Sequence, residues 1–166
     1  MRTVKKITGG MLLVVLALVL AALPQRAASH APQIVEKQNS SPSGADEPLP
    51  AFHDRAPKDT LPATMDPAQF RQPVISNAYA VAARTKKVLY QEPCYCHCDR
   101  SQGHGSLLDC FVSKHGAGCN ICMSEDFYSY EQTQKGRTPA QIREGIVKGE
   151  WQSVDLSKYA SPLPLK

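Results

Sequence analysis

The stretch PCYCHCDRSQGHGSLLDCFVSKHGAGCNIC, residues 93–122, holds all six cysteines of the chain. The pattern is C-x-C-x-C, eleven residues, a single Cys, eight residues and a final C-x-x-C. Six thiols so close in sequence are typical of disulfide bridges, of soft-metal ligands or of a redox pair. The fold and the function predicted for this chain both depend on which of these three applies.

An apolar run of 13 residues, Met11 to Leu23, follows a basic N-terminus. Such a run after positive residues is the pattern of a secretory signal. It is shorter than the roughly 20 residues that a membrane-spanning helix needs. We therefore predict a signal peptide over residues 1–29, cleaved after Ser29, and an extracytoplasmic protein, periplasmic or secreted. Only an uncleaved N-terminal segment would hold the protein at a membrane.

The charge of the chain points away from nucleic acid. The whole chain has 19 Lys and Arg against 15 Asp and Glu, but residues 1–29 contain four of the basic residues and no acid. The remainder therefore carries 15 residues of each sign. A nucleic-acid partner would need a basic patch or stripe, so we expect none.

Composition divides the rest of the chain into three parts. Residues 30–65 contain six prolines and no hydrophobic period, which predicts a disordered Pro-rich tether. A Cys-rich helical domain is expected over residues 66–152, followed by an irregular tail over 153–166. A domain this small benefits from a metal or disulfide staple.

Hydrophobic periodicity predicts a small all-α domain with about four helices and one extended Cys-rich loop. Asp66 and Pro67 can begin a helix, which Pro73 restarts. Thr138 and Gln141 form a capping box. Residues 87–93 are expected to be extended. The helices are expected at residues 73–87, 106–115, 120–135 and 138–151.

Export and an even cysteine count favour a disulfide framework. However, residues i and i+2 of an extended chain lie about 6.6 Å apart, at the upper limit of the Cα separation that a disulfide accepts. Each cysteine of C-x-C-x-C would then need a distant partner. A disulfide-stapled extracytoplasmic domain that docks a protein partner therefore stays open as the alternative.

Spacing favours a metal site. Alternate residues of an extended segment point to one side, so the first three sulfurs would line one edge. The last two share a face at the start of a helix. Thiolates select Cu(I), Zn(II) or iron–sulfur clusters. Iron–sulfur clusters rank last because they are inserted before export. Cu(I) ranks above zinc because it tolerates low-coordinate, sulfur-rich sites. We predict a metal-binding protein for storage, delivery or detoxification.

Histidines within the same stretch extend the set of candidate ligands. His104 lies between two glycines, whereas His97 lies between two cysteines but points away from them in an extended chain. His115 is expected to complement a helix dipole instead. The predicted metal ligands are Cys94, Cys96, Cys98, Cys110, Cys119, Cys122, His104 and His97.

A thiol–disulfide redox protein that uses Cys119 and Cys122 is the second alternative. A lone C-x-x-C is weak evidence without a βαβ context. The sequence contains no G-x-S-x-G elbow, phosphate loop or dinucleotide fingerprint. We expect no enzyme.

The cysteine stretch quoted above resembles a bacterial family of unknown function named for its Pro-Cys-Tyr-Cys-Gly-Cys motif. The segments AYAVAARTKKVLYQEP and TPAQIREGIVKGEW are also similar to it, so the resemblance covers Pro73 to Trp151. His97 stands where the family name has Gly. Family members look exported or lipid-anchored, and the resemblance implies that the six cysteines act as one constellation without saying what they hold.

Overall fold

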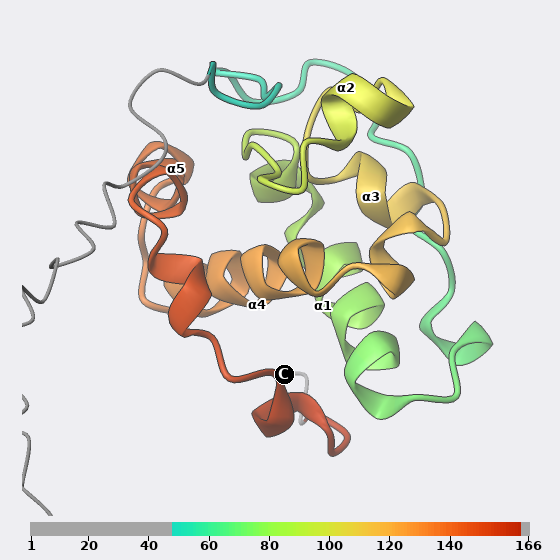
Figure 1. The fold of residues 1–166 in the computed structure, drawn as a ribbon. Coiled ribbons are helices and arrows are strands. Elements are labelled where there is room, and N and C mark those ends of the chain that lie inside the picture. The colour runs from blue at the N-terminus through green and yellow to red at the C-terminus, as the bar shows by residue number, and fades with distance from the viewer. Residues whose placement is uncertain (1–47, 164–166) are drawn as a thin grey trace, which may run out of the picture. The chain divides into compact units, whose positions relative to one another are not determined.

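Two long helices form the centre of the structure, a computed structural model that describes residues 48–163. Helix α1 spans Pro73–Leu89 and helix α4 spans Asn120–Gln134. They pack against each other, with the shorter elements around them (Figure 1). The described residues are helical or irregular and form no strand, which confirms the predicted all-α class.

Helix α1 supplies one wall of the hydrophobic core. It begins at Pro73, whose fixed φ suits the first helical position. Ala78, Val81 and Ala82 are fully buried, as the predicted apolar face requires. The fully buried ring of Tyr79 packs edge-on against Phe111, with ring centroids 5.2 Å apart. The same core includes four of the cysteines, so the thiols are continuous with the hydrophobic interior.

Helix α5, Pro139–Val147, packs against α4 and is followed by the 3₁₀ turn η3, Glu150–Ser153. The predicted capping box at its start is confirmed, because the side chain of Thr138 accepts from the Gln141 amide and the Gln141 side chain accepts from the Thr138 amide. The contact with α4 requires Gly145, since a Cβ there would lie 1.8 Å from the Tyr128 hydroxyl oxygen.

The elements around the cysteines are shorter than predicted. Helix α2 spans Cys98–Gln102, α3 spans Asp109–Val112 and the 3₁₀ turn η2 spans His115–Gly118. The prediction of one helix over residues 106–115 is wrong, because Ser113 has an extended backbone (φ −126°, ψ −177°) that ends α3 before η2 begins. Ahead of α3, the amides of Leu107 and Leu108 donate to the carbonyls of Glu92 and Leu89.

Residues 87–93 were also expected to be extended, and they are not. Helix α1 continues to Leu89. The amides of Gln91 and Glu92 then donate to the carbonyls of Val88 and Leu89, at 2.7 and 3.2 Å. The chain therefore leaves α1 through a tight turn, which places the following cysteines directly beside the end of the helix.

The second half of the predicted tether differs from the expectation of disorder. Residues 48–65 form no regular element, but they lie against the helical domain. Pro50 is buried, the rings of His53 and Tyr90 stack with centroids 3.9 Å apart, and the Met65 amide donates to the Phe111 carbonyl at 2.9 Å. Isolated apolar and aromatic residues anchor this strap, which we define as residues 48–65, although no sequence period marks them.

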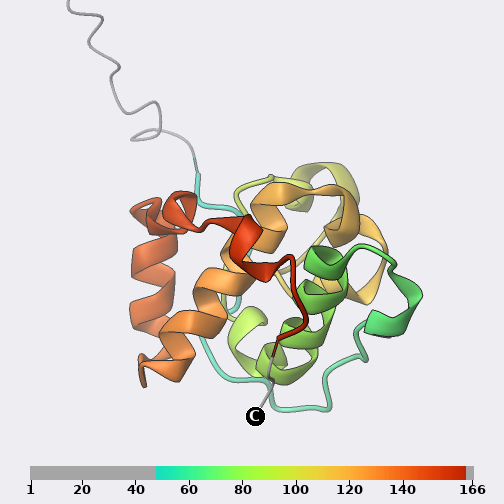
Figure 2. The same ribbon diagram turned by 90° about the horizontal axis from the view of Figure 1, so that it is seen from below.

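The two ends of the predicted domain carry further 3₁₀ turns. Asp66 caps only η1, Pro67–Gln69, instead of a longer helix. At the other end, the expected irregular tail contains η4, Leu156–Tyr159. The Tyr159 ring stacks on Phe127 with centroids 3.6 Å apart. Figure 2 shows this C-terminal segment running back across α1.

The predicted signal peptide, the first part of the tether and residues 164–166 lie outside the described residues. Among residues 48–163, every helix is too short or too polar to cross a membrane.

Candidate metal centre

The first three cysteines lie on a curled loop instead of an extended edge. The His97 amide donates to the Cys94 carbonyl at 3.1 Å, and His97 itself has a left-handed backbone with φ of 55°. Helix α2 then begins at Cys98. The prediction of three sulfurs along one edge is therefore wrong in its geometry. The curl nevertheless moves the Sγ atoms of Cys94 and Cys96 to within 3.4 Å of each other.

The other three cysteines reach the loop from two helix starts. Cys110 lies on α3, which the Leu107 and Leu108 amides fix against the end of α1. Cys119 immediately precedes α4, and Cys122 lies in its first turn. Three segments that are separate in sequence thus converge on one place.

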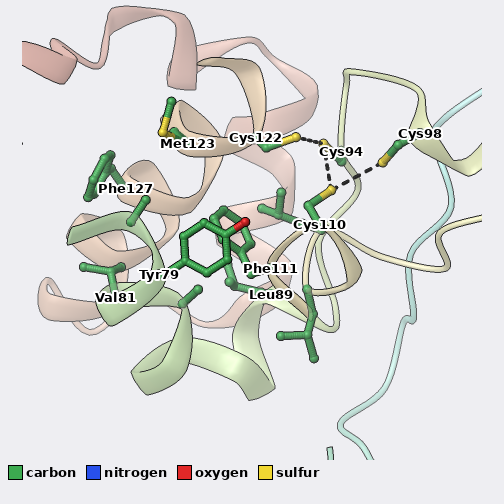
Figure 3. Close-up of a cluster of buried hydrophobic side chains, with 14 of the residues drawn as sticks. Tyr79, Val81, Leu89, Cys94, Cys98, Cys110, Phe111, Cys122, Met123 and Phe127 are labelled. Carbon is green, nitrogen blue, oxygen red and sulfur yellow. Dashed lines mark hydrogen bonds between the residues drawn. The ribbon is translucent and has the colours of Figure 1, made fainter. Parts of the chain in front are cut away.

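The sulfur atoms form a continuous network of contacts. The Cys94 Sγ atom lies 3.4 Å from that of Cys122 and 3.9 Å from that of Cys110. The Cys110 Sγ atom lies 3.4 Å from that of Cys98, and the Cys122 Sγ atom lies 3.5 Å from that of Cys96. Figure 3 shows four of these sulfurs pointing toward one another at the edge of the aromatic core. Most of the sulfurs therefore contact more than one other sulfur.

Burial gives this network an inner and an outer side. The inner thiols are 3% exposed or less: Cys94, Cys98, Cys110 and Cys122. Cys96 and Cys119 are only partly buried, and the Cys119 thiol interacts with those of Cys96 and Cys122. A ligand would therefore reach the network from the side of Cys96 and Cys119.

Two histidines complete the donor set. The Nδ1 atom of His104 lies 3.1 Å from the Cys98 sulfur and 3.4 Å from the Cys110 sulfur. The Nε2 atom of His115 lies 3.7 Å from the Cys96 sulfur. Sequence reasoning included His104 but assigned His115 to a helix end. The sequence offered one signal that His115 is a donor, which is its position between two predicted ligands, Cys110 and Cys119.

The side chains combine into three overlapping groups of four whose ligand atoms all lie within 4.8 Å of one another. The groups are Cys94, Cys96, Cys98 and Cys110; Cys96, Cys110, His115 and Cys122; and Cys98, His104, Cys110 and His115. Cys110 belongs to every group, whereas within the described part of the chain neither Cys119 nor His97 belongs to one. These buried Cys and His groups could form a metal site.

Contacts between the thiols change their acidity in opposite directions. A hydrogen bond with Cys122 lowers the pKa of Cys110 to about 4, and a hydrogen bond with Cys110 lowers the pKa of Cys96. The hydrogen bonds with Cys110 raise the pKa of Cys94, Cys98 and Cys122. Without a cation, some thiols thus carry the protons that stabilise neighbouring thiolates. A bound metal would displace those protons, because thiolate is the ligand form.

Two buried carboxyl groups follow or precede the cysteines closely in sequence, Glu92 two residues before Cys94 and Glu125 three residues after Cys122, and sequence reasoning missed both. Burial raises the pKa of Glu92 to about 9 and that of Glu125 to about 8. The Oε1 atom of Glu125 accepts from the Tyr95 amide at 2.8 Å, which fixes the loop between two cysteines. Burial therefore favours the neutral form of both acids, which limits the charge that Glu125 adds near the thiolates. The i, i+3 spacing of Cys122 and Glu125 on α4 was the available signal.

The strap covers the inner side of the site. Pro50 and Ala51 line the same small space as Cys94, Cys98 and His104. The Ala51 amide donates to the Asp99 carboxylate at 3.3 Å. Chain that precedes the predicted domain thus lines the site beside Cys94, Cys98 and His104.

Comparison with protein families matches residues 12–162 to the model of proteins of unknown function with the PCYCGC motif. The chain belongs to this family. Its motif here reads PCYCHC, with His97 at the fifth position, where the motif has Gly. Glycine adopts a left-handed backbone without strain, so the φ of 55° at His97 explains why the motif contains Gly. Neither the comparison with curated proteins nor that with solved structures found a match.

Proposed function

We propose that this protein is an exported soft-metal-binding protein that holds Cu(I), with zinc as the second choice, for storage, delivery or detoxification. The observation that carries the proposal is the convergence of six sulfurs and two imidazole nitrogens on one largely buried place. Thiolates and imidazoles suit Cu(I) and Zn(II), and hard cations prefer oxygen ligands. Cu(I) comes first because it tolerates low coordination numbers in sulfur-rich surroundings.

The histidines distinguish this proposal from a disulfide framework. A framework of three bridges gives each sulfur one partner and makes no use of imidazole. Here the His104 Nδ1 atom lies near two sulfurs at once, at 3.1 and 3.4 Å. The disulfide-stapled domain remains the alternative, and its first bridges would be Cys94–Cys122 and Cys98–Cys110, whose sulfurs are each 3.4 Å apart.

The redox alternative has less support. Cys122 is fully buried among other sulfurs, so only Cys119 of the C-x-x-C pair is accessible. The thioredoxin-like context would also need strands, and residues 48–163 form none. No specific observation therefore favours the redox alternative.

A role in binding, and not in catalysis, fits the surroundings of the donors. A catalytic zinc site keeps a coordination position open for water or substrate. The space beside Cys94, Cys98 and His104 is small and is lined by Pro50 and Ala51. We propose that metal exchanges with a partner at the side of Cys96 and Cys119. The extracytoplasmic location rests on the signal-like sequence of residues 1–29.

A competition titration tests the proposal. The fully reduced chain is titrated with Cu(I), and separately with Zn(II), in anaerobic buffer that contains a chromophoric chelator. We expect the chain to withdraw Cu(I) from the chelator stoichiometrically and to do so more strongly than it withdraws Zn(II). A folded chain with six free thiols that leaves both metals on the chelator would contradict a metal-binding function.

A further inference from the structure

The shortest contacts between donor atoms form two adjoining triangles. In the first, which we call the thiol triangle, the sulfurs of Cys94, Cys96 and Cys122 lie 3.4, 3.4 and 3.5 Å apart. Every pair in it is in contact. Two of its members come from the curled loop and the third from the first turn of α4.

The second set, which we call the mixed triangle, contains two sulfurs and one nitrogen. The sulfurs of Cys98 and Cys110 lie 3.4 Å apart, and the His104 Nδ1 atom lies 3.1 and 3.4 Å from them. Its members come from α2, from α3 and from the segment between these helices. Each triangle therefore has its own backbone support.

The triangles meet at one edge, where the Cys94 and Cys110 sulfurs lie 3.9 Å apart. This separation is larger than every contact within a triangle. Of the remaining donors, the His115 Nε2 atom is 3.7 Å from the Cys96 sulfur, and a His115 ring nitrogen also lies within 4.8 Å of the Cys98 and Cys110 sulfurs. Cys119 interacts with Cys96 and Cys122. The shortest contacts thus form two triangles, and His115 lies between them.

Coordination chemistry favours two ions over one. A tetrahedral ion uses four ligands, so a single ion would leave buried thiols unused next to it. A three-coordinate ion at about 2.3 Å from each sulfur spaces its ligands about 4 Å apart. Each triangle would therefore need to open by only about half an ångström to hold such an ion. A thiolate can also bridge two ions, and the sulfur of Cys110, a member of the mixed triangle, lies 3.9 Å from that of Cys94 in the thiol triangle.

We propose that the site binds two soft cations of the Cu(I) class, one in the thiol triangle and one in the mixed triangle. This inference rests on the proposed function, because it divides the same donors into two subsites. The mixed subsite holds two thiolates against three in the other. It therefore carries less negative charge once each triangle holds one Cu(I).

Native mass spectrometry of the reduced full chain titrated with Cu(I) tests the division. We expect two bound ions in the parent chain and one in His104→Ala, because the mixed triangle loses its nitrogen. His97→Ala is the matched control, since His97 belongs to no donor group among the described residues, and it should retain two ions. Circular dichroism confirms that each variant folds.

X-ray absorption at the copper edge gives an independent readout that needs no variant. At one equivalent the dominant scatterers should be sulfur alone, and at two equivalents a nitrogen contribution should appear. One ion per chain, or two ions in His104→Ala with unchanged scattering, would overturn the two subsites and leave the proposed function standing. No bound ion would instead overturn the proposed function.

Discussion

The Nδ1 atom of His104 lies 3.1 Å from the Sγ atom of Cys98, and the same nitrogen lies 3.4 Å from the sulfur of Cys110. These three side chains come from two short helices and the segment between them. An imidazole nitrogen near two sulfurs is an arrangement found in mixed Cys and His metal sites, and a disulfide has no use for it. The predictions below test what this arrangement does and what supports it.

Replacing Cys110 should weaken metal binding more than replacing Cys119. Cys110 belongs to all three donor groups and is fully buried, whereas Cys119 belongs to none and is partly exposed. Even loss of an outer partner of a ligand typically lowers metal affinity about 10–100-fold. We expect Cys110→Ser to lower metal affinity by more than about 100-fold and Cys119→Ser to lower it by less than about 10-fold. Chelator competition measures both, and equal losses would argue against a central role for Cys110.

His97→Gly should stabilise the fold. His97 has a φ of 55°, and a left-handed backbone costs a residue with a Cβ about 1–2 kcal/mol. Glycine recovers part of this, so we expect the free energy of unfolding to rise by about 0.5–1 kcal/mol, with metal affinity unchanged. Urea denaturation measures the free energy.

Gly103→Ala is the opposite control for this backbone argument. Gly103 has a φ of 69°, and a Cβ there would meet no atom within 4 Å. The substitution therefore adds backbone strain without a steric clash and should destabilise by about 1 kcal/mol. If His97→Gly destabilised the protein as well, the side chain of His97 would have a role that the backbone argument omits.

Glu125 should act as a neutral hydrogen-bond acceptor that positions the loop. Its Oε1 atom accepts from the Tyr95 amide at 2.8 Å, and burial raises its pKa to about 8. Glu125→Gln retains an acceptor oxygen and should preserve stability and metal affinity at pH 7. Glu125→Ala leaves the Tyr95 amide unpaired and should cost about 1–3 kcal/mol. Equal effects of the two variants, measured by denaturation, would refute the acceptor role.

Asp126 predicts a pH dependence of stability. It is fully buried, burial raises its pKa well above the ordinary range, and its two carboxyl oxygens have no hydrogen-bond partner among residues 48–163. The folded state therefore keeps the proton that the unfolded state loses near pH 4. The stability that the protonated Asp126 contributes is fully present below pH 4. As pH rises toward the raised pKa, the free energy of unfolding falls by up to about 1.4 kcal/mol per pH unit.

Asp126→Asn isolates this effect, because the other buried acids titrate alike in both proteins. The two chains should be similarly stable at pH 4, and the variant should become progressively more stable than the parent as pH rises to 8. Thermal or urea unfolding across this range gives the difference. A difference that does not change with pH would show that Asp126 does not titrate in the way that its burial implies.

The sequence predicted the long elements well because local signals govern them. The apolar face of α1, the extent of α4 and the capping box of α5 follow from periodicity and capping residues. The predicted helix over residues 106–115 failed because the extended backbone of Ser113 separates α3 from η2. Neither glycine nor proline marks this break in the sequence.

The candidate site was predictable in its residues but not in its shape. Clustering in sequence identified the cysteines and His104. The left-handed backbone at His97 curls the loop, and the sequence did not predict this conformation because His97 is not a glycine. His115 and the strap were missed for the same reason, since only the packed fold brings them to the thiols. Conversely, His97 is adjacent to two ligands in sequence and belongs to no donor group in the described chain.

The native mass spectrum of the chain, isolated from its own compartment without added thiol or chelator, tests the central claim most directly. The account predicts a mass that equals the processed chain plus bound soft metal, with thiols that become reactive only after acid releases the metal. A metal-free chain whose mass is lower by two hydrogens for each of three bridges, with no thiol appearing on acidification, would contradict it.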